Sequence, residues 1–89
     1  MKAVITVVGK DMVGILAKVS AVCAEKGANI AEVSQTVLQE MFCMIMLVEL
    51  DKEKKNFSEV SDALSKLGED NALVIHMMHE EIFNTMHRI

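Results

Sequence analysis

One segment constrains the fold of this chain more than any other. Residues 41–50 read MFCMIMLVEL, an almost wholly apolar stretch. Side chains alternate between the two faces of a strand, so Phe42 and Met44 point one way while Met41 and Ile45 point the other. A strand that is apolar on both sides belongs in the interior of a sheet, with cover on each face.

Three further segments read as strands. Residues 3–8 are rich in β-branched side chains and predict a second central strand. Residues 28–39 carry many polar side chains and predict an edge strand, with a bulge or bend between Ile30 and Val33. Residues 72–79 predict the fourth strand.

Two segments have the spacing of amphipathic helices. Residues 13–26 repeat apolar side chains on one face, with Asp11 placed as an N-cap and Gly27 placed to end the helix. A second helix opens at Asn56 in a pattern like a capping box, and Gly68 is expected to end it.

The element order is βαββαβ, followed by a short helix over about residues 80–89. A tight connection at residues 39–40 makes the second and third strands a hairpin, and right-handed crossovers place both longer helices on one face of the sheet. The sequence therefore predicts an α+β, ferredoxin-like sandwich whose four-stranded antiparallel sheet has the order 4-1-3-2. Residues 1–89 are expected to form a single domain.

This layout leaves one face of the sheet without a helix. Exposing Met41, Ile45 and Leu47 to water forgoes a free energy comparable to the whole stability of a small domain. Exposed apolar patches of this kind mark interfaces. We therefore expect a homodimer that covers the open face or continues the sheet edge; packing of the final helix on that face is the alternative.

Composition excludes several classes of partner. The net charge is -4 and aromatic residues make up 3% of the chain, which argues against nucleic acid and against an anionic membrane surface. No apolar run is long enough to span a membrane, and no secretory signal is visible. Cys23 and Cys43 are expected to be buried free thiols, which indicates a soluble cytoplasmic protein.

No catalytic or metal-binding motif stands out. Neither of the glycine-rich phosphate-binding patterns occurs, and nothing supports a catalytic triad. His76 and His79 lie three residues apart on a predicted strand, so they point to opposite faces and cannot share an ion. We expect no enzyme activity, no cofactor and no metal.

Two short motifs carry a family resemblance. Residues 9–16, GKDMVGIL, resemble the ACT-domain signature Asp-x-x-Gly-(Ile/Leu), and residues 27–30, GANI, resemble its Gly-x-Asn-Ile motif. They stand in the right order on either side of one predicted helix. The chain is similar to a small stand-alone ACT family, akin to the glycine-cleavage-system transcriptional repressor and the regulatory domain of formyltetrahydrofolate deformylase.

The resemblance implies binding at a subunit interface. ACT domains pair, and they often hold a small ligand, commonly an amino acid, between the paired domains. The positions that match the usual site are Lys10, Asp11, Met12, Val13, Gly14, Ile15, Asn29 and Ile30. The first amides of a helix lack intrahelical partners and can bind a carboxylate, while Gly14 allows close approach and Asn29 offers both a donor and an acceptor.

Each of these residues also has a purely structural interpretation. Asp11 serves equally as a simple cap, Gly14 as a close-packing residue, Asn29 as a turn residue and Lys10 as a solvated charge. Our hypothesis is a non-catalytic regulatory or sensory module that binds a small amino acid or related metabolite at a homodimer interface. The alternative is a dimer that regulates a partner enzyme or transcription factor by protein interaction, with no ligand.

Overall fold

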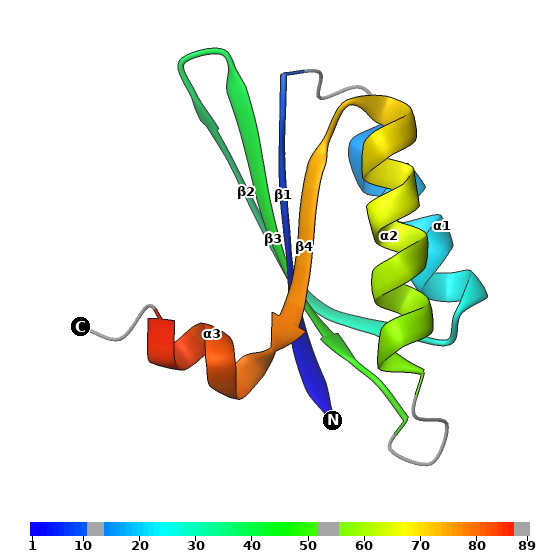
Figure 1. Cartoon of the computed structure of the whole chain (residues 1–89). Helices are drawn as coiled ribbons and strands as arrows, with labels where there is room; N and C mark the ends of the chain where they lie inside the picture. The colour runs from blue at the N-terminus through cyan, green and yellow to red at the C-terminus, as the bar shows by residue number, and fades with distance from the viewer. Residues whose placement is uncertain (11–13, 52–55, 87–89) are drawn as a thin grey trace.

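Strands and helices follow one another along the chain in the predicted order, βαββαβ with a final helix (Figure 1). The computed structural model describes residues 1–10, 14–51 and 56–86. In these ranges the elements are β1 (Lys2–Gly9), α1 (Ile15–Glu25), β2 (Asn29–Leu38), β3 (Met41–Glu49), α2 (Phe57–Asn71), β4 (Val74–His79) and α3 (Glu80–Met86). The predicted final helix is therefore confirmed to Met86, and residues 87–89 lie outside the described residues.

The strands form one antiparallel sheet in the order β2-β3-β1-β4, which confirms the predicted order 4-1-3-2. The apolar strands β1 and β3 are central and the polar strand β2 is at an edge, as their side chains predict. The pairing of β2 with β3 shifts register between Ile30 and Glu32, which confirms the bulge. Gln39 takes a positive φ of 58° in the tight turn that joins the two strands.

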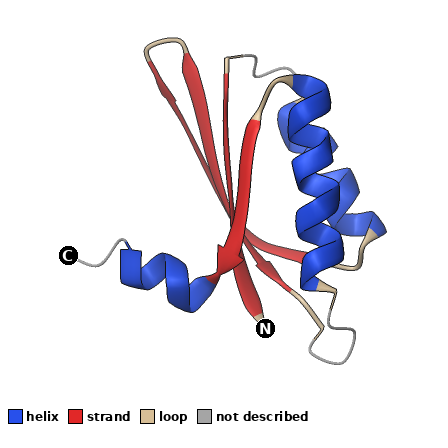
Figure 2. Cartoon of the chain, viewed as in Figure 1, coloured by secondary structure: helices blue, strands red, loops and turns tan. Residues whose placement is uncertain are grey.

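The main core lies between the sheet and the two longer helices, which cover the same face (Figure 2). The side chains of β3 that point to this face are all buried, because α1 and α2 pack over them. The largest fully buried side chains are Ile5, Met44, Met46, Leu64, Val7, Val19, Val48, Val60 and Cys23. The strand and helix patterns in the sequence therefore meet in one apolar layer.

The prediction that Gly68 ends the second helix is wrong. Helix α2 continues to Asn71, and Ala72 takes the left-handed conformation at its end, with φ 56°. A Cβ atom on Gly68 would lie 2.7 Å from the carbonyl oxygen of Leu73, so the chain that leaves the helix passes against this glycine. Gly68 is needed for close packing inside the helix rather than for its end.

The observed ends of α1 agree only in part with those predicted from the sequence. The helix begins at Ile15 rather than at residue 13, and its N-cap position is Gly14 rather than Asp11. Asp11 itself lies outside the described residues. At the other end Gly27 takes a positive φ of 77°, which confirms its predicted role.

Asn56 precedes α2 as predicted, but it does not cap the helix. Its side chain makes no capping hydrogen bond, so the predicted capping box with Glu59 is wrong, although Glu59 does lie in the first turn. Asn56 Nδ2 instead donates a hydrogen bond to the carbonyl oxygen of Lys26, at the end of α1. This buried side chain therefore ties the start of one helix to the end of the other.

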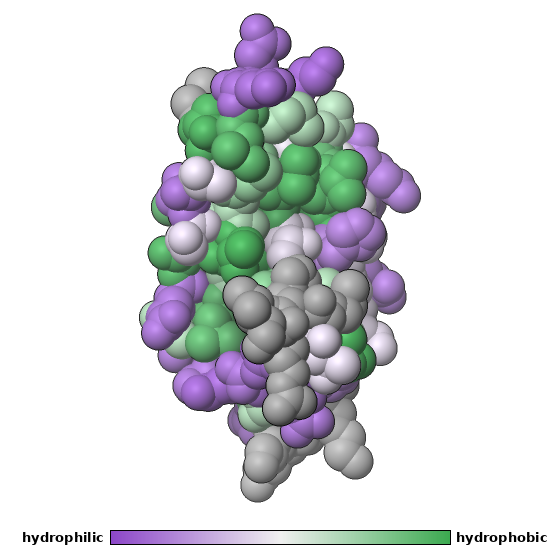
Figure 3. Space-filling view, turned by 90° about the vertical axis from the view of Figure 1, so that its left-hand side faces the viewer, coloured by the Kyte–Doolittle hydropathy of each residue, from purple (hydrophilic) through white to green (hydrophobic). Residues whose placement is uncertain are grey.

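The face of the sheet opposite α1 and α2, which we call the open face, is covered only in part. Val4 lies on this face and is buried outside the main core, where α3 contacts β1 and β4. Met41 and Ile45 remain 37% and 44% exposed. Figure 3 shows apolar side chains gathered over part of this face, with hydrophilic ones around its margins. The final helix thus provides some of the missing cover and leaves the rest of the face exposed.

Candidate functional site

The first predicted binding segment lies where β1 gives way to α1, at what we call the Gly9 end of the sheet. Lys10 follows the strand and is exposed, whereas Ile15 is buried at the start of α1. Gly14 takes the left-handed conformation with φ 72°, so this position favours glycine. The candidate residues Asp11, Met12 and Val13 lie outside the described residues.

The second predicted binding segment lies at the opposite end of the sheet. Asn29 pairs with Glu49, and Glu49 also pairs with Lys2 at the start of β1, so we call this the Lys2 end. Lys2 and Gly9 are the two ends of one strand, so they lie about 23 Å apart at about 3.3 Å per residue. Within one chain the structure therefore does not bring Asn29 and Ile30 together with the β1–α1 segment.

A hollow of about 390 Å³ opens at the Gly9 end, beside the first binding segment. It is lined by Val8, Gly9, Lys10, Met41, Asn71, Ala72 and Val74. Of these residues the sequence predicted only Lys10 as part of a site, because the others reach the hollow from strands and from a helix end that lie far apart in the sequence. A Cβ atom on Gly9 would collide with the side chain of Leu73, which accounts for glycine at this point.

The hollow has polar groups of both signs. Lys10 lines it with a cation, whereas Asn71 and Ala72 bring to it the carbonyl end of α2, which carries a partial negative charge. The amide of Asn71 is already engaged, since Nδ2 donates to the carbonyl of Leu67 at 2.9 Å and Oδ1 accepts from Lys18 Nζ at 2.8 Å. Valine and methionine side chains form the other walls, so the hollow combines one cation with a largely apolar lining.

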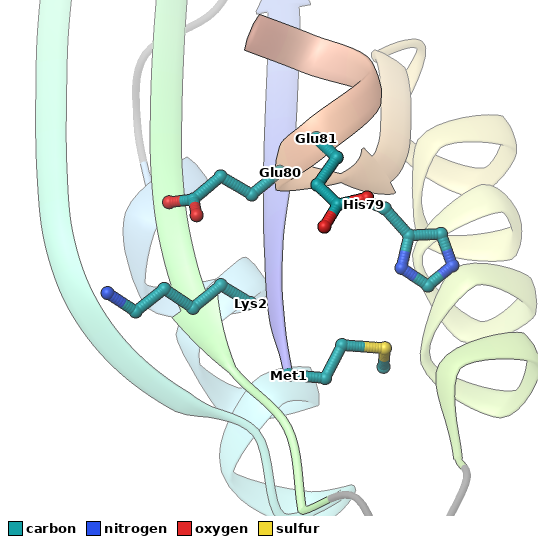
Figure 4. A pocket seen from close by; sticks show the side chains of 5 residues that line it. All are labelled: Met1, Lys2, His79, Glu80 and Glu81. Carbon is teal, nitrogen blue, oxygen red and sulfur yellow. The ribbon is translucent and has the colours of Figure 1, made fainter.

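A second hollow, of about 350 Å³, lies at the Lys2 end and was not signalled by the sequence. Figure 4 shows its lining residues, in which the Lys2 and Glu80 side chains extend to the same side. His79 turns toward α2, where its ring stacks on Phe57 with 4.4 Å between centroids. The hollow is lined by charges of both signs, and among the described residues no group of three His, Cys, Asp or Glu side chains could hold a metal ion.

The two histidines of β4 do lie on opposite faces of the sheet. His76 pairs with Thr6, whereas His79 pairs with Ala3 and stacks on Phe57 of the helix layer. Their alternation is therefore as predicted, and their separation by the sheet leaves them unable to share a ligand.

The two cysteines lie in different environments. Cys23 is buried in the core, and this burial raises the pKa of its thiol. Cys43 lies on the open face, opposite Val8, and is only partly buried. Both thiols are free, so the expectation of buried free thiols is confirmed for Cys23 and is wrong for the burial of Cys43.

Comparisons with known proteins give the chain a family. The model of the ACT domain matches residues 2–78. A UPF0237 protein of Methanococcus maripaludis is 49% identical over 86 residues, which cover 97% of this chain and 96% of that protein. A UPF0237 protein of Listeria monocytogenes is 47% identical over 89 residues and matches along 100% of both chains.

Solved structures agree with the sequence comparisons. An ACT domain protein from Streptococcus pneumoniae superposes with a TM-score of 0.82 and 43% identity, over 93% of each chain. A proposed glycine cleavage system transcriptional repressor superposes with a TM-score of 0.75 and 29% identity, over 85% of this chain and 43% of that one. A formyltetrahydrofolate deformylase from Pseudomonas putida, 11% identical, shares the fold with a TM-score of 0.75 over 88% of this chain and 28% of that one.

These matches confirm the resemblance that the two short motifs indicated. None of the helices in the described ranges has the length and apolar character needed to cross a membrane. The chain belongs to the ACT domain family, whose members are regulatory, ligand-binding modules.

Proposed function

We propose that this chain is a non-catalytic regulatory module that binds a small amino acid or related metabolite between two copies of itself. The observation that carries the proposal is that the two motif segments lie at opposite ends of the sheet, which are about 23 Å apart along β1 at about 3.3 Å per residue. An amino acid is far shorter than this distance. A ligand that meets both segments must therefore take one of them from each of two copies.

The sheet edge offers a way to bring the segments together. Strand β2 is ten residues long, contains no proline or lysine, and carries one charged side chain, Glu32. Native edge strands are usually protected by such residues, by bulges or by covering segments. The bulge of β2 lies near its start, between Ile30 and Glu32, so the uncharged stretch from Val33 to Leu38 is the part of the edge that favours pairing. Within the described residues β2 pairs with β3 alone, which leaves its outer backbone groups available.

Antiparallel pairing of β2 with the β2 of a second copy would place opposite ends side by side. The start of β2, with Asn29, would then lie level with the end of β2 in the other copy. That end pairs with Met41, which lines the hollow beside Lys10. The Gly14 segment of one copy and Asn29 of the other would thus share one end of a continuous sheet, with helix amides and Lys10 facing a carboxylate.

A ligand held in this way would act as a regulator. It binds the paired arrangement better than the separate copies, so it shifts the population toward the pair by its differential affinity. A partner protein would read the change in pairing. Both thiols are free, which fits a reducing compartment, and we propose the cytoplasm as the location.

Thermal unfolding in the presence of single amino acids tests the proposal. A ligand present at about 100 times its dissociation constant should stabilise the fold by about 2.7 kcal/mol. Asn29→Ala should abolish that shift. Asn84→Ala, which removes an exposed asparagine on α3, is the matched control and should keep it. An Asn29→Ala variant that is stabilised as much as the wild type would contradict the proposed site.

The exposed apolar open face favours a second candidate function. In that case the dimer binds a partner enzyme or transcription factor through its surface and needs no ligand. This alternative predicts that no amino acid raises the unfolding temperature. It also predicts that Asn29→Ala behaves as the wild type in the cell.

A further inference from the structure

Helix α2 ends at the Gly9 end of the sheet, against the hollow described there (Figure 1). Its last residue, Asn71, and its C-cap residue, Ala72, both line the hollow. The amides of Ala72 and Leu73 both donate to the carbonyl of Gly68. Within residues 56–86, which the structure describes, the carbonyls that follow Gly68 are thus left without helical partners. They give this wall of the hollow a partial negative charge.

The charged side chains at the end of α2 increase this negative charge. The last turn of this described helix carries Glu69 and Asp70 and contains no basic residue. A basic side chain is the usual choice at this position, because a cation is stabilised near the carbonyl end of a helix. Departures from such local rules are expected at functional sites. The end of α2 is therefore suited to a cation that the helix does not supply itself.

Lys18 of α1 reaches the same end of α2, but its charge is directed to a side chain. Its Nζ donates to Asn71 Oδ1 at 2.8 Å, and Asn71 Nδ2 donates to the carbonyl of Leu67 at 2.9 Å. Both ends of the Asn71 side-chain amide are thus engaged within the protein. The backbone carbonyls of Asn71 and Ala72 are the acceptors that this wall offers to a ligand.

The hollow also presents a positive charge. Lys10 lines it directly after β1 and is exposed, and an ammonium group of this kind suits a carboxylate. One cation and one group of carbonyl oxygens together match a molecule that carries both a carboxylate and an ammonium group, as a free α-amino acid does. A molecule with only one of these charges would leave the other polar wall without a partner.

The remaining walls are aliphatic and partly exposed. Met41 and Val74 are 37% and 56% exposed, so a ligand that covers them removes apolar surface from water. Val8 pairs with Val74, and the two side chains lie on the same face of the sheet. Among the described residues that line the hollow, none carries a hydroxyl or a carboxyl group. The lining therefore favours an aliphatic ligand side chain over a polar one.

We propose that this hollow selects an α-amino acid with a branched aliphatic side chain, of the valine or leucine class. The ligand ammonium binds at the carbonyl end of α2, and the ligand carboxylate binds Lys10. This selectivity rests on the proposed function, which requires only that some small amino acid or related metabolite binds. It gives α2, which carries neither of the two motifs, a direct part in ligand recognition.

Calorimetric titration of the full chain with a graded set of amino acids tests the side-chain preference. Affinity should rise about fourfold for each methylene added from alanine through 2-aminobutyrate and valine to leucine, because each one is buried against the aliphatic walls. Threonine, which has nearly the shape of valine but carries a hydroxyl group, should bind about tenfold more weakly than valine, or weaker still. Serine that binds as tightly as leucine would overturn the preference.

A charge reversal on α2 tests the ammonium site. Asp70→Lys places a base in the last turn and should weaken leucine binding at least about tenfold. Asp62→Lys makes the same change at an exposed position in the middle of α2 and should leave the affinity unchanged. The unfolding temperature without ligand should not fall in Asp70→Lys, since lysine suits the end of a helix. Equal leucine affinities in the two variants would contradict the site.

The ligand can be changed instead of the protein. Leucine without its amino group, 4-methylpentanoate, should bind the wild type at least about tenfold more weakly than leucine, because the carbonyl end of α2 then has no cation to bind. If 4-methylpentanoate binds as tightly as leucine, the end of α2 is not an ammonium site.

These titrations also distinguish ligand selection by the hollow from the proposed function. If serine or glycine binds more tightly than leucine and Asn29→Ala abolishes that binding, the proposed function stands and selection by the hollow is overturned. If leucine binds with the expected pattern and Asn29→Ala leaves its affinity unchanged, the hollow is supported and a site shared between copies is contradicted. If no amino acid binds, both are contradicted.

Discussion

The two faces of β3 have nearly the same side chains but very different surroundings. On the helix side Phe42, Met44, Met46 and Val48 are all at most 4% exposed. On the open side Met41 and Ile45 keep more than a third of their surface in water. The difference comes from the elements that pack over each face, so an apolar pattern alone specifies that a surface is covered without specifying what covers it.

The largest expected effect comes from comparing two adjacent residues of β3 that point to opposite faces of the sheet. Met46→Ala removes a fully buried side chain and should lower the free energy of unfolding by about 2–5 kcal/mol, because it leaves a cavity. Ile45→Ala, one residue away on the open face, should cost well under half as much, because that side chain is already 44% exposed. Urea unfolding measures both, and equal losses would mean that the two faces are equally buried.

The next effect concerns how closely the helix layer packs on the covered face. Gly68→Ala places a methyl group against the Leu73 carbonyl and should destabilise the fold by about 1–2 kcal/mol, despite the better helix propensity of alanine. The same substitution at an exposed helix position, Ser65→Ala, is the control and should be neutral or stabilising. A Gly68→Ala variant that gains stability would show that the chain after α2 does not approach the helix this closely.

A smaller effect tests the tie between the two helices of the covered face. Asn56→Ala removes the hydrogen bond to the Lys26 carbonyl and should cost about 1 kcal/mol. Asn84→Ala, on α3 beside the open face, should cost less because that side chain is exposed. Chemical denaturation of the two variants decides whether the buried asparagine links the helices, and equal costs would exclude such a link.

The smallest expected effect is a pH dependence of stability that comes from Cys23, the cysteine on the helix side of the sheet. Burial raises the pKa of Cys23 in the folded state. The stability that this thiol contributes is therefore complete below its unfolded pKa and is lost as the pH rises through the folded value. The free energy of unfolding should decline slightly in alkaline buffer for the wild type and decline less in Cys23→Ala. Identical slopes for the two proteins would contradict the effect.

Much of the fold could be predicted because its signals are local or follow from simple geometry. The apolar side chains on both faces of residues 41–50 and the polar character of β2 predicted which strands are central and which is at the edge. The bulge in β2 was predicted because Ile30 and Val33 break the alternation of apolar side chains in that strand. The end of α2 could not be predicted. Glycine is needed at position 68 because the Leu73 carbonyl packs against it in the folded chain, a contact that the sequence does not reveal. The helix ends instead at Ala72, which adopts a left-handed conformation that alanine does not favour.

The candidate site was predictable only in pieces. The motifs around Gly14 and Asn29 indicated a family, and the family matched. Their positions at opposite ends of the sheet depend on the crossover through α1, which a motif does not describe. The hollow beside Lys10 was missed because Asn71 and Val74 reach it from a part of the chain far away in sequence.

A mixing experiment with two binding variants tests the central claim most directly. Gly14→Asp introduces a residue that still tolerates positive φ and is favourable at the start of a helix. Its negative charge, however, repels the carboxylate of a ligand. Asn29→Ala removes the other half of the site. With the amino acid that stabilises the wild type, each variant alone should show no thermal shift, and an equal mixture should recover binding at one site of each mixed pair. A mixture that binds no more than the separate variants would show that the two segments do not form one site between copies.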